Sequence, residues 1–172
     1  MKRPTLPLPA WYRPLPLLAE MKQWADYGPL SDIFAPSLNN TISGLLDHKQ
    51  LDITDASQCA AMEQGSRLCR QIWQVAGGWL QCERADYLIA ISCNRIRNWH
   101  AAAEAAQAGL DTIAANGTED VDRSFLLLEL ARAWREMGRQ EECVAKRNEA
   151  FALAEQFDEV GLREWFDWRA AA

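Results

Sequence analysis

The sequence predicts an all-α fold made of antiparallel helix pairs, with an extended, proline-rich arm at the N-terminal end. All seven prolines of the 172-residue chain lie between Pro4 and Pro36. Because proline costs about 3 kcal/mol inside a helix, the long proline-free remainder is compatible with uninterrupted helices. Apolar residues recur there at helical spacing, and alanine, the strongest helix former, is concentrated in residues 101–108.

The N-terminal third divides into an arm, a short helix and an ambiguous stretch. We expect residues 1–14 to form the arm and residues 15–172 to form a single helical domain. A helix over about 15–26 has apolar residues on one face and ends at Tyr27-Gly28-Pro29. Residues 30–54 stay open, because isoleucine and leucine there favour a helix whereas glycine and an Asn-Asn pair oppose one.

From residue 55 onward the helical signals are stronger. Asp55 with Gln58 resembles a capping box and starts a helix that Gly77-Gly78 ends. The apolar run 87–93 fits a buried strand or a helix by periodicity, and the alanine-rich tract that follows it favours a helix. Further helices are predicted at about 80–97, 99–115, 120–137, 139–157 and 159–170.

Composition and charge exclude several classes of protein. The formal net charge is −6, which argues against nucleic acid as a partner, because phosphate binding requires clustered Lys and Arg. No stretch reaches the roughly 18 continuous apolar residues that a membrane helix needs, so no membrane partner is expected. Prolines interrupt the start of the chain where an export signal would be apolar, which predicts a cytoplasmic protein.

The sequence lacks the motifs of catalysis and of metal or cofactor binding. It has two isolated histidines, no Cys-x-x-Cys pair among its five cysteines, and no glycine-rich phosphate loop. Cys93 with His100 is a formal nucleophilic pair, but a predicted turn at Arg97-Asn98 separates them. We therefore expect no catalytic residues, no metal and no cofactor.

A repeated pattern lies in the C-terminal half. It reads Leu127-x-x-Leu130-Ala131-x-x-Trp134-x-x-x-Gly138, followed by Cys143 and Ala150-Phe151. This pattern resembles a tetratricopeptide repeat, in which these positions mark two paired helices. A degenerate copy lies 41 residues earlier, with Asp86 at a usually apolar position and Arg97 in place of the turn glycine. The period exceeds the roughly 34 residues of the family, and the surplus falls between residues 111 and 122.

The resemblance covers about residues 83–157. It implies helix pairs at about 80–115 and 120–157, stacked as a short right-handed superhelix, with a capping helix at 159–170. An ordinary antiparallel α–α bundle is the alternative, because small and apolar residues at these spacings suit any close helix pair. The resemblance further implies that the first helix of each pair lines a concave binding surface, at Arg84, Tyr87, Ile91, Asn94, Arg95, Phe125, Leu128, Arg132, Arg135 and Glu136.

The arginines of this surface suit an acidic segment, or a free C-terminal carboxylate, of a protein or peptide partner. The sequence therefore predicts a non-enzymatic protein–protein interaction module, that is, a scaffold or adaptor. One alternative is a dimeric regulatory or chaperone-like helical protein without a peptide groove, in which Trp11 and Trp168 of two copies meet. Another is an enzyme whose site is assembled from distant residues. Of the eight tryptophans, Trp73, Trp134 and Trp165 are expected to fill gaps between helices.

Overall fold

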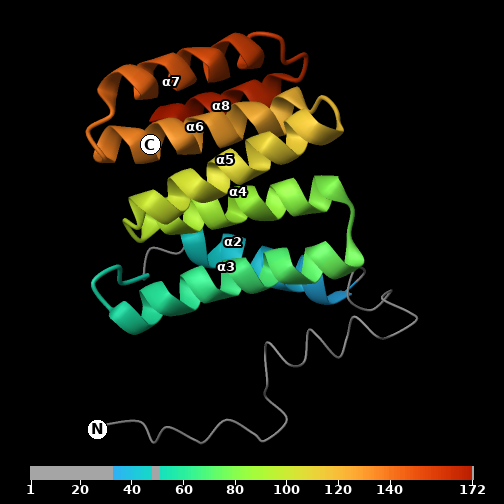
Figure 1. Cartoon of the computed structure of the whole chain (residues 1–172), viewed down its shortest axis with the longest axis vertical. Helices are drawn as coiled ribbons and strands as arrows, with labels where there is room; N and C mark the ends of the chain where they lie inside the picture. Colours follow the sequence, from blue (N-terminus) through green and yellow to red (C-terminus); the bar gives the residue numbers. More distant parts are fainter. Residues whose placement is uncertain (1–32, 48–50, 172) are drawn as a thin grey trace, which may run out of the picture.

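The computed structural model describes residues 33–47 and 51–171, and over these residues the chain is all-α, with seven helices and no strand. The all-α prediction is thus confirmed for this part of the chain. The predicted arm at 1–14 and the predicted helix at 15–26 lie outside the described residues. The helices, labelled in Figure 1, are α2 (Ala35–Asp47), α3 (Ala56–Ala76), α4 (Trp79–Arg95), α5 (Trp99–Asn116), α6 (Asp120–Glu136), α7 (Gln140–Ala154) and α8 (Val160–Ala171).

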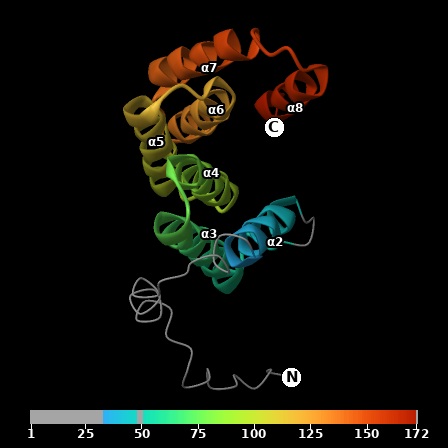
Figure 2. The same ribbon diagram turned by 90° about the vertical axis from the view of Figure 1, so that its right-hand side faces the viewer.

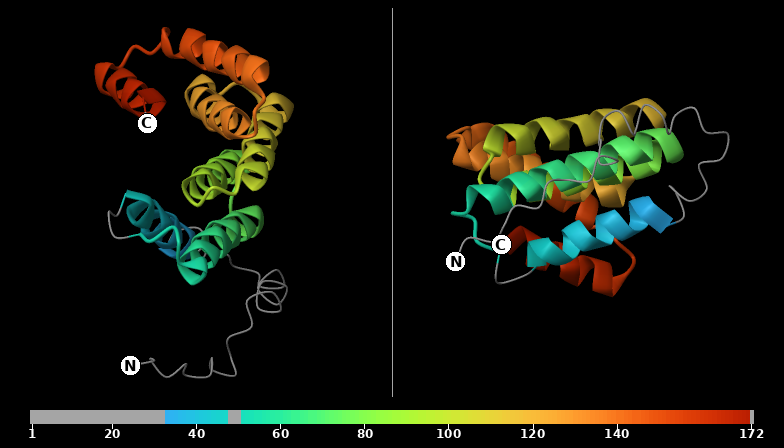
Figure 3. Two further views of the ribbon diagram at one scale, coloured as in Figure 1. Left: turned by 90° about the vertical axis from the view of Figure 1, so that its left-hand side faces the viewer. Right: turned by 90° about the horizontal axis from the view of Figure 1, so that it is seen from below.

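The helices lie side by side in a curved stack. From α2 to α7 each helix packs on the next, and α4 also contacts α2 and α6. Figure 2 and the left view of Figure 3 show α3, α5 and α7 on the outer side of the curve. The inner side is formed by α2, α4, α6 and α8.

The capping signal at Asp55 sets the start of α3. The Asp55 carboxylate accepts hydrogen bonds from the backbone N–H groups of Ser57 and Gln58, at 2.8 and 3.3 Å. These bonds satisfy donors that the first turn of a helix leaves unpaired.

Within residues 30–54 the chain forms α2, where Ile42, 4% exposed, packs with buried residues of α3 and α4.

Small side chains let α5 approach its two neighbours closely. Ala102 and Ala106 are fully buried in a core cluster shared by α4, α5 and α6. At Gly109 a Cβ atom would lie 2.8 Å from a methyl carbon of Leu126 on α6. The alanine-rich composition of α5 therefore follows from its position between two helices as well as from helix propensity.

The helix pairs α4–α5 and α6–α7 share one geometry. Trp79 and Asp120, which begin α4 and α6, are 41 positions apart, as are the first residues of α5 and α7. Each pair is joined by the same turn, in which a left-handed residue follows the first helix: Arg97 with φ 64° and Gly138 with φ 79°. The Arg97 N–H donates to the Asn94 carbonyl. The Gly138 N–H donates to the Arg135 carbonyl, which is 41 positions after Asn94. These are the bonds of a Schellman motif.

We expect a Gly109→Ala variant to be less stable than its position in a helix alone would predict. Alanine in place of an exposed helical glycine stabilises by about 1 kcal/mol, but at Gly109 the new methyl group meets Leu126. Gly44→Ala is the matched control, because a Cβ there meets no atom within 4 Å. Urea unfolding should show a gain for Gly44→Ala and none for Gly109→Ala, and equal gains would contradict the close approach of α5 and α6.

Candidate functional site

A pocket of about 330 Å³ lies on the inner side of the curve and is rich in arginine. Its arginines come from three places: the end of α4 and the turn after it, α6, and α8. They are Arg95, Arg97, Arg132, Arg135 and Arg169. The other lining residues are Leu46, Ile53, Ile91, Asn94, Trp99 and Glu136. Of the predicted concave surface, the structure thus brings together Ile91, Asn94, Arg95, Arg132, Arg135 and Glu136.

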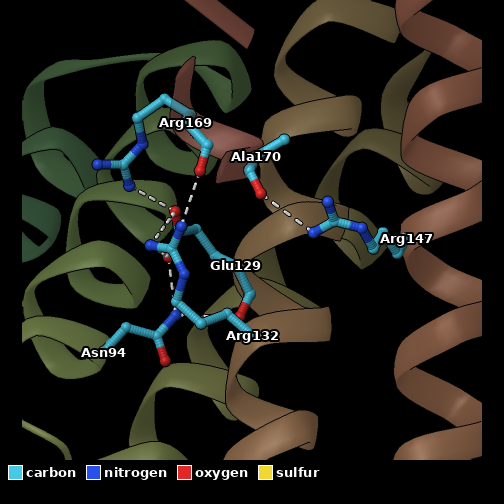
Figure 4. Close-up of polar contacts among 6 residues, drawn as sticks. All are labelled: Asn94, Glu129, Arg132, Arg147, Arg169 and Ala170. Carbon is cyan, nitrogen blue, oxygen red and sulfur yellow. Dashed lines mark hydrogen bonds and ion pairs between the residues drawn. The ribbon is translucent and has the colours of Figure 1, made fainter. Parts of the chain in front are cut away.

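The buried carboxylate of Glu129 joins three helices beneath this pocket (Figure 4). Glu129 is 1% exposed and belongs to α6. It accepts hydrogen bonds from the Asn94 amide nitrogen of α4 at 2.8 Å and from Arg132 at 3.3 Å. It also forms an ion pair with Arg169 of α8. A carboxylate can be buried at acceptable cost only when cations and donors surround it in this way.

Two guanidinium groups hold the end of α8. Arg132 donates to the Arg169 carbonyl oxygen at 2.9 Å, and Arg147 of α7 donates to the Ala170 carbonyl oxygen at 3.1 Å (Figure 4). The last carbonyls of a helix have no partner within the helix and carry its negative dipole end, so both contacts are favourable. Arg132 is therefore committed to Glu129 and to α8.

The remaining pocket arginines differ in whether an acidic side chain pairs with them. Arg135 forms an ion pair with the adjacent Glu136 at 3.0 Å, and both side chains are exposed. Within residues 33–47 and 51–171, neither Arg95 nor Arg97 has a hydrogen-bond or ion-pair partner. Arg95, Arg97 and Arg135 are the cations that this pocket presents to a ligand.

The other predicted surface residues lie elsewhere. Arg84 is exposed and binds Asp122 at 2.8 Å, at the opposite end of α4 from Arg95. Tyr87 packs edge-on against Phe125, and burial raises the pKa of its hydroxyl, an effect that the Glu129 charge reinforces.

The placement of Phe125 and Leu128 on a binding surface requires correction, because both side chains are buried. They are 3% and 5% exposed, because both belong to the core cluster beneath α8. The ring of Phe125 lies 4.5 Å from that of Trp165 and 5.5 Å from that of Phe166, both on α8. Trp165 is itself 47% exposed, so it covers the core rather than filling a gap inside it.

Five pocket residues were not among the predicted surface residues: Leu46, Ile53, Arg97, Trp99 and Arg169. Arg97 and Trp99 belong to the turn and to the start of the second helix of a pair, whereas the repeat offsets select the first helix only. Arg169 comes from α8, outside the repeats. For Arg97 the sequence did carry a signal, namely an arginine at a turn position where the other copy has glycine.

A second acidic group is buried at the far end of α4. Glu83 is fully buried, and its carboxylate oxygens have no hydrogen-bond partner that the structure describes. Burial raises the pKa of Glu83 to about 9, and the neighbouring carboxylate of Asp122 acts in the same direction. Burial therefore favours the protonated form of Glu83, against the Arg84 guanidinium 3.5 Å away, which favours the carboxylate.

The formal pair Cys93 and His100 has no geometry for catalysis. Cys93 is fully buried, whereas His100 is exposed on α5. Burial raises the pKa of the Cys93 thiol to about 11, so the reactive thiolate is scarce at neutral pH. Within the described part of the chain, no group of three or more His, Cys, Asp or Glu side chains is placed to hold a metal ion.

Comparisons with protein-family models, with curated proteins and with solved structures find no match to this chain. None of the helices described has the length and apolar character needed to cross a membrane. The inference of function therefore rests on the pocket and on the helix pairs themselves.

Replacing Glu129 with Gln should destabilise the fold by about 3 kcal/mol, because it leaves the charges of Arg132 and Arg169 without their counterion. Hydrogen exchange should accelerate first in α8, the helix that these contacts hold. Glu136→Gln, at an exposed ion pair, is the matched control and should change stability by less than about 0.5 kcal/mol. Equal effects of the two changes in urea unfolding would contradict the role of Glu129.

Replacing Glu83 with Gln should stabilise the protein in a pH-dependent manner. The pKa of Glu83 rises on folding from about 4.5 to about 9. Below pH 4.5 the side chain is neutral in both the folded and the unfolded chain, so its stabilising contribution is full. As the pH rises toward 9 the unfolded chain ionises first, and the free energy of unfolding falls until this contribution is lost. Glutamine carries no such pH-dependent penalty. Urea unfolding should show little difference at pH 5 and a gain of at least about 1 kcal/mol at pH 8.5. Exposed Glu104→Gln is the control, and a gain that does not grow with pH would refute a raised pKa for Glu83.

Proposed function

We propose that this chain is a non-enzymatic protein–protein interaction module that binds an acidic segment of a protein or peptide partner in the arginine-lined pocket. The observation that carries the proposal is the gathering of five arginines from α4, its following turn, α6 and α8 around one pocket. Acidic side chains and a C-terminal carboxylate are both suited to guanidinium groups, which bind carboxylates through paired, directional hydrogen bonds.

The pocket is positively charged, although the chain as a whole is negatively charged. The net charge of the whole sequence is −6, yet the pocket walls contain five arginines and a single acidic residue, Glu136. A local positive field on an acidic protein favours one orientation of an acidic partner and disfavours approach at other faces. Apolar contacts from Ile91, Leu46 and Trp99 would supply buried area beside the ionic contacts.

The arrangement of the helix pairs supports a tetratricopeptide-like interpretation over an irregular bundle. The two pairs have matching bounds and the same turn, and the first helix of each lies on the inner side of the curve (Figure 2). Stacked helical repeats of this kind form extended concave surfaces that bind partner segments. The α8 helix then serves as the capping helix, because it covers the apolar residues of α6 and α7.

A second candidate function is pairing of two copies through α8. Trp168 is 58% exposed and Trp165 is 47% exposed, and both belong to this helix. Exposed tryptophans are typical anchors of protein interfaces. The Trp11 of this hypothesis lies outside the described residues. Light scattering of the wild type and of a Trp168→Ser variant tests it, since a dimer that the variant dissociates would favour this function.

Charge reversal at Arg95 should abolish partner capture without unfolding the protein. Arg95 is exposed and has no ion-pair partner in the described part of the chain, so Arg95→Glu should leave the melting temperature within about 2 °C of the wild type. Quantitative mass spectrometry of proteins captured from a lysate should show at least tenfold depletion of the main acidic partner.

Arg67→Glu is the matched control for this experiment. Arg67 is an exposed arginine of α3 whose ion pair is local, with Glu63. The Arg67→Glu variant should capture the partner as the wild type does. Equal capture by the wild type and both variants would refute the pocket as the binding site and would favour pairing through α8.

A further inference from the structure

Arg97 occupies a backbone conformation that favours glycine. Its φ of 64° is the only positive value at a non-glycine residue within the described ranges, and the corresponding turn of the second pair has Gly138 at φ 79°. Both turns have the same hydrogen bonds, from Asn98 to Cys93 at 2.8 Å and from Arg139 to Trp134 at 2.9 Å. The turn therefore does not require an arginine, and its left-handed conformation disfavours one.

The Arg97 side chain contributes to the pocket instead. With Arg95 it lacks an ionic partner among the described residues, and it lies in the same pocket wall as Arg132, Arg135 and Arg169. Arg135 is paired with Glu136, and Arg132 and Arg169 are both paired with the buried Glu129. Arg95 and Arg97 therefore leave two positive charges without an ionic partner among the described residues, more than one carboxylate neutralises.

Asn94 provides an unpaired hydrogen-bond acceptor, in addition to the positive charges of the arginines. Its amide nitrogen donates to the Glu129 carbonyl at 3.0 Å and to the Glu129 carboxylate at 2.8 Å, which fixes the orientation of the amide. Asn94 is 5% exposed, and its Oδ1 atom lacks any hydrogen-bond partner that the structure describes (Figure 4). A buried acceptor without a partner is rare in proteins, and Asn94 is one of the residues that line the pocket.

We propose that the pocket binds the phosphoryl group of a phosphorylated serine or threonine in a peptide, with Arg97 as a phosphate-binding residue. This inference rests on the proposed function and specifies its ligand. A phosphomonoester carries about two negative charges at pH 7 and three acceptor oxygens, so it matches the excess charge better than a carboxylate does. A peptide also places apolar groups against Leu46, Ile91 and Trp99 of the pocket, which inorganic phosphate cannot do.

The binding experiment uses the full chain and three fluorescein-labelled peptide pools with the same degenerate flanks. The central residue is phosphoserine, glutamate or serine. By fluorescence anisotropy at pH 7.5 and 0.15 M salt, we expect the phosphoserine pool to bind at least tenfold more tightly than the other two pools. A glutamate pool that binds as tightly as the phosphoserine pool would overturn the phosphoryl proposal while supporting the proposed acidic-segment function.

Two substitutions at Arg97 separate ligand binding from structure. Arg97→Gly should raise the melting temperature by about 2–4 °C, because glycine adopts the left-handed conformation without strain. The same change should weaken binding of the phosphoserine pool at least fivefold. Arg97→Asn, which tolerates this backbone conformation, should weaken binding equally, and Arg67→Ala should leave it unchanged.

Each remaining outcome decides the proposal. Unchanged phosphoserine binding by Arg97→Gly and Arg97→Asn would overturn the role of Arg97. Competition by inorganic phosphate at the same concentration as the phosphoserine pool would overturn the peptide as the source of the phosphoryl group. Failure of all three pools to bind would refute the phosphoryl site, and capture by Arg95→Glu would then decide the proposed function independently.

Discussion

The inner side of this protein depends on one buried carboxylate. Glu129 lies where α4, α6 and α8 meet, and it binds a side chain from each of them: Asn94, Arg132 and Arg169. A buried carboxylate cannot be left unpaired without a cost of several kcal/mol, so these contacts hold the three helices together. The position of most of the arginine pocket follows, because seven of its eleven lining residues belong to these same three helices.

Local rules predicted most of the helices from the sequence. The Asp55 cap and the Gly77-Gly78 end of α3 act through the local backbone, and the alanines of α5 favour a helix through their own propensity. The offsets implied by the resemblance to a tetratricopeptide repeat also selected Asn94, Arg95, Arg132 and Arg135, which line one pocket in the structure. Asp86, which weakened the earlier copy as a repeat, is accounted for by its ion pair with Arg70 of α3 at 2.9 Å.

What could not be predicted is the contribution of elements outside the repeat. The docking of α8 buries Phe125 and Leu128 and brings Arg169 to the pocket, and these contacts join residues far apart in the sequence. No periodicity distinguishes Glu129 or Glu83, both buried, from an exposed glutamate on the same helix. Burial of such a residue is decided by the partners that other helices bring, and a single sequence does not identify them.

The order of contacts also has a consequence for how the chain folds. The extensive contacts run from each helix to the next between α2 and α7, and between α4 and the two helices two places away. Structures dominated by such short-range contacts form rapidly, because little loop entropy is lost before each contact is made. Either helix pair can therefore act as a nucleus onto which its neighbours add, as in other stacked-helix proteins. The pocket, whose walls come from both pairs and from α8, is complete only when the last of them has docked.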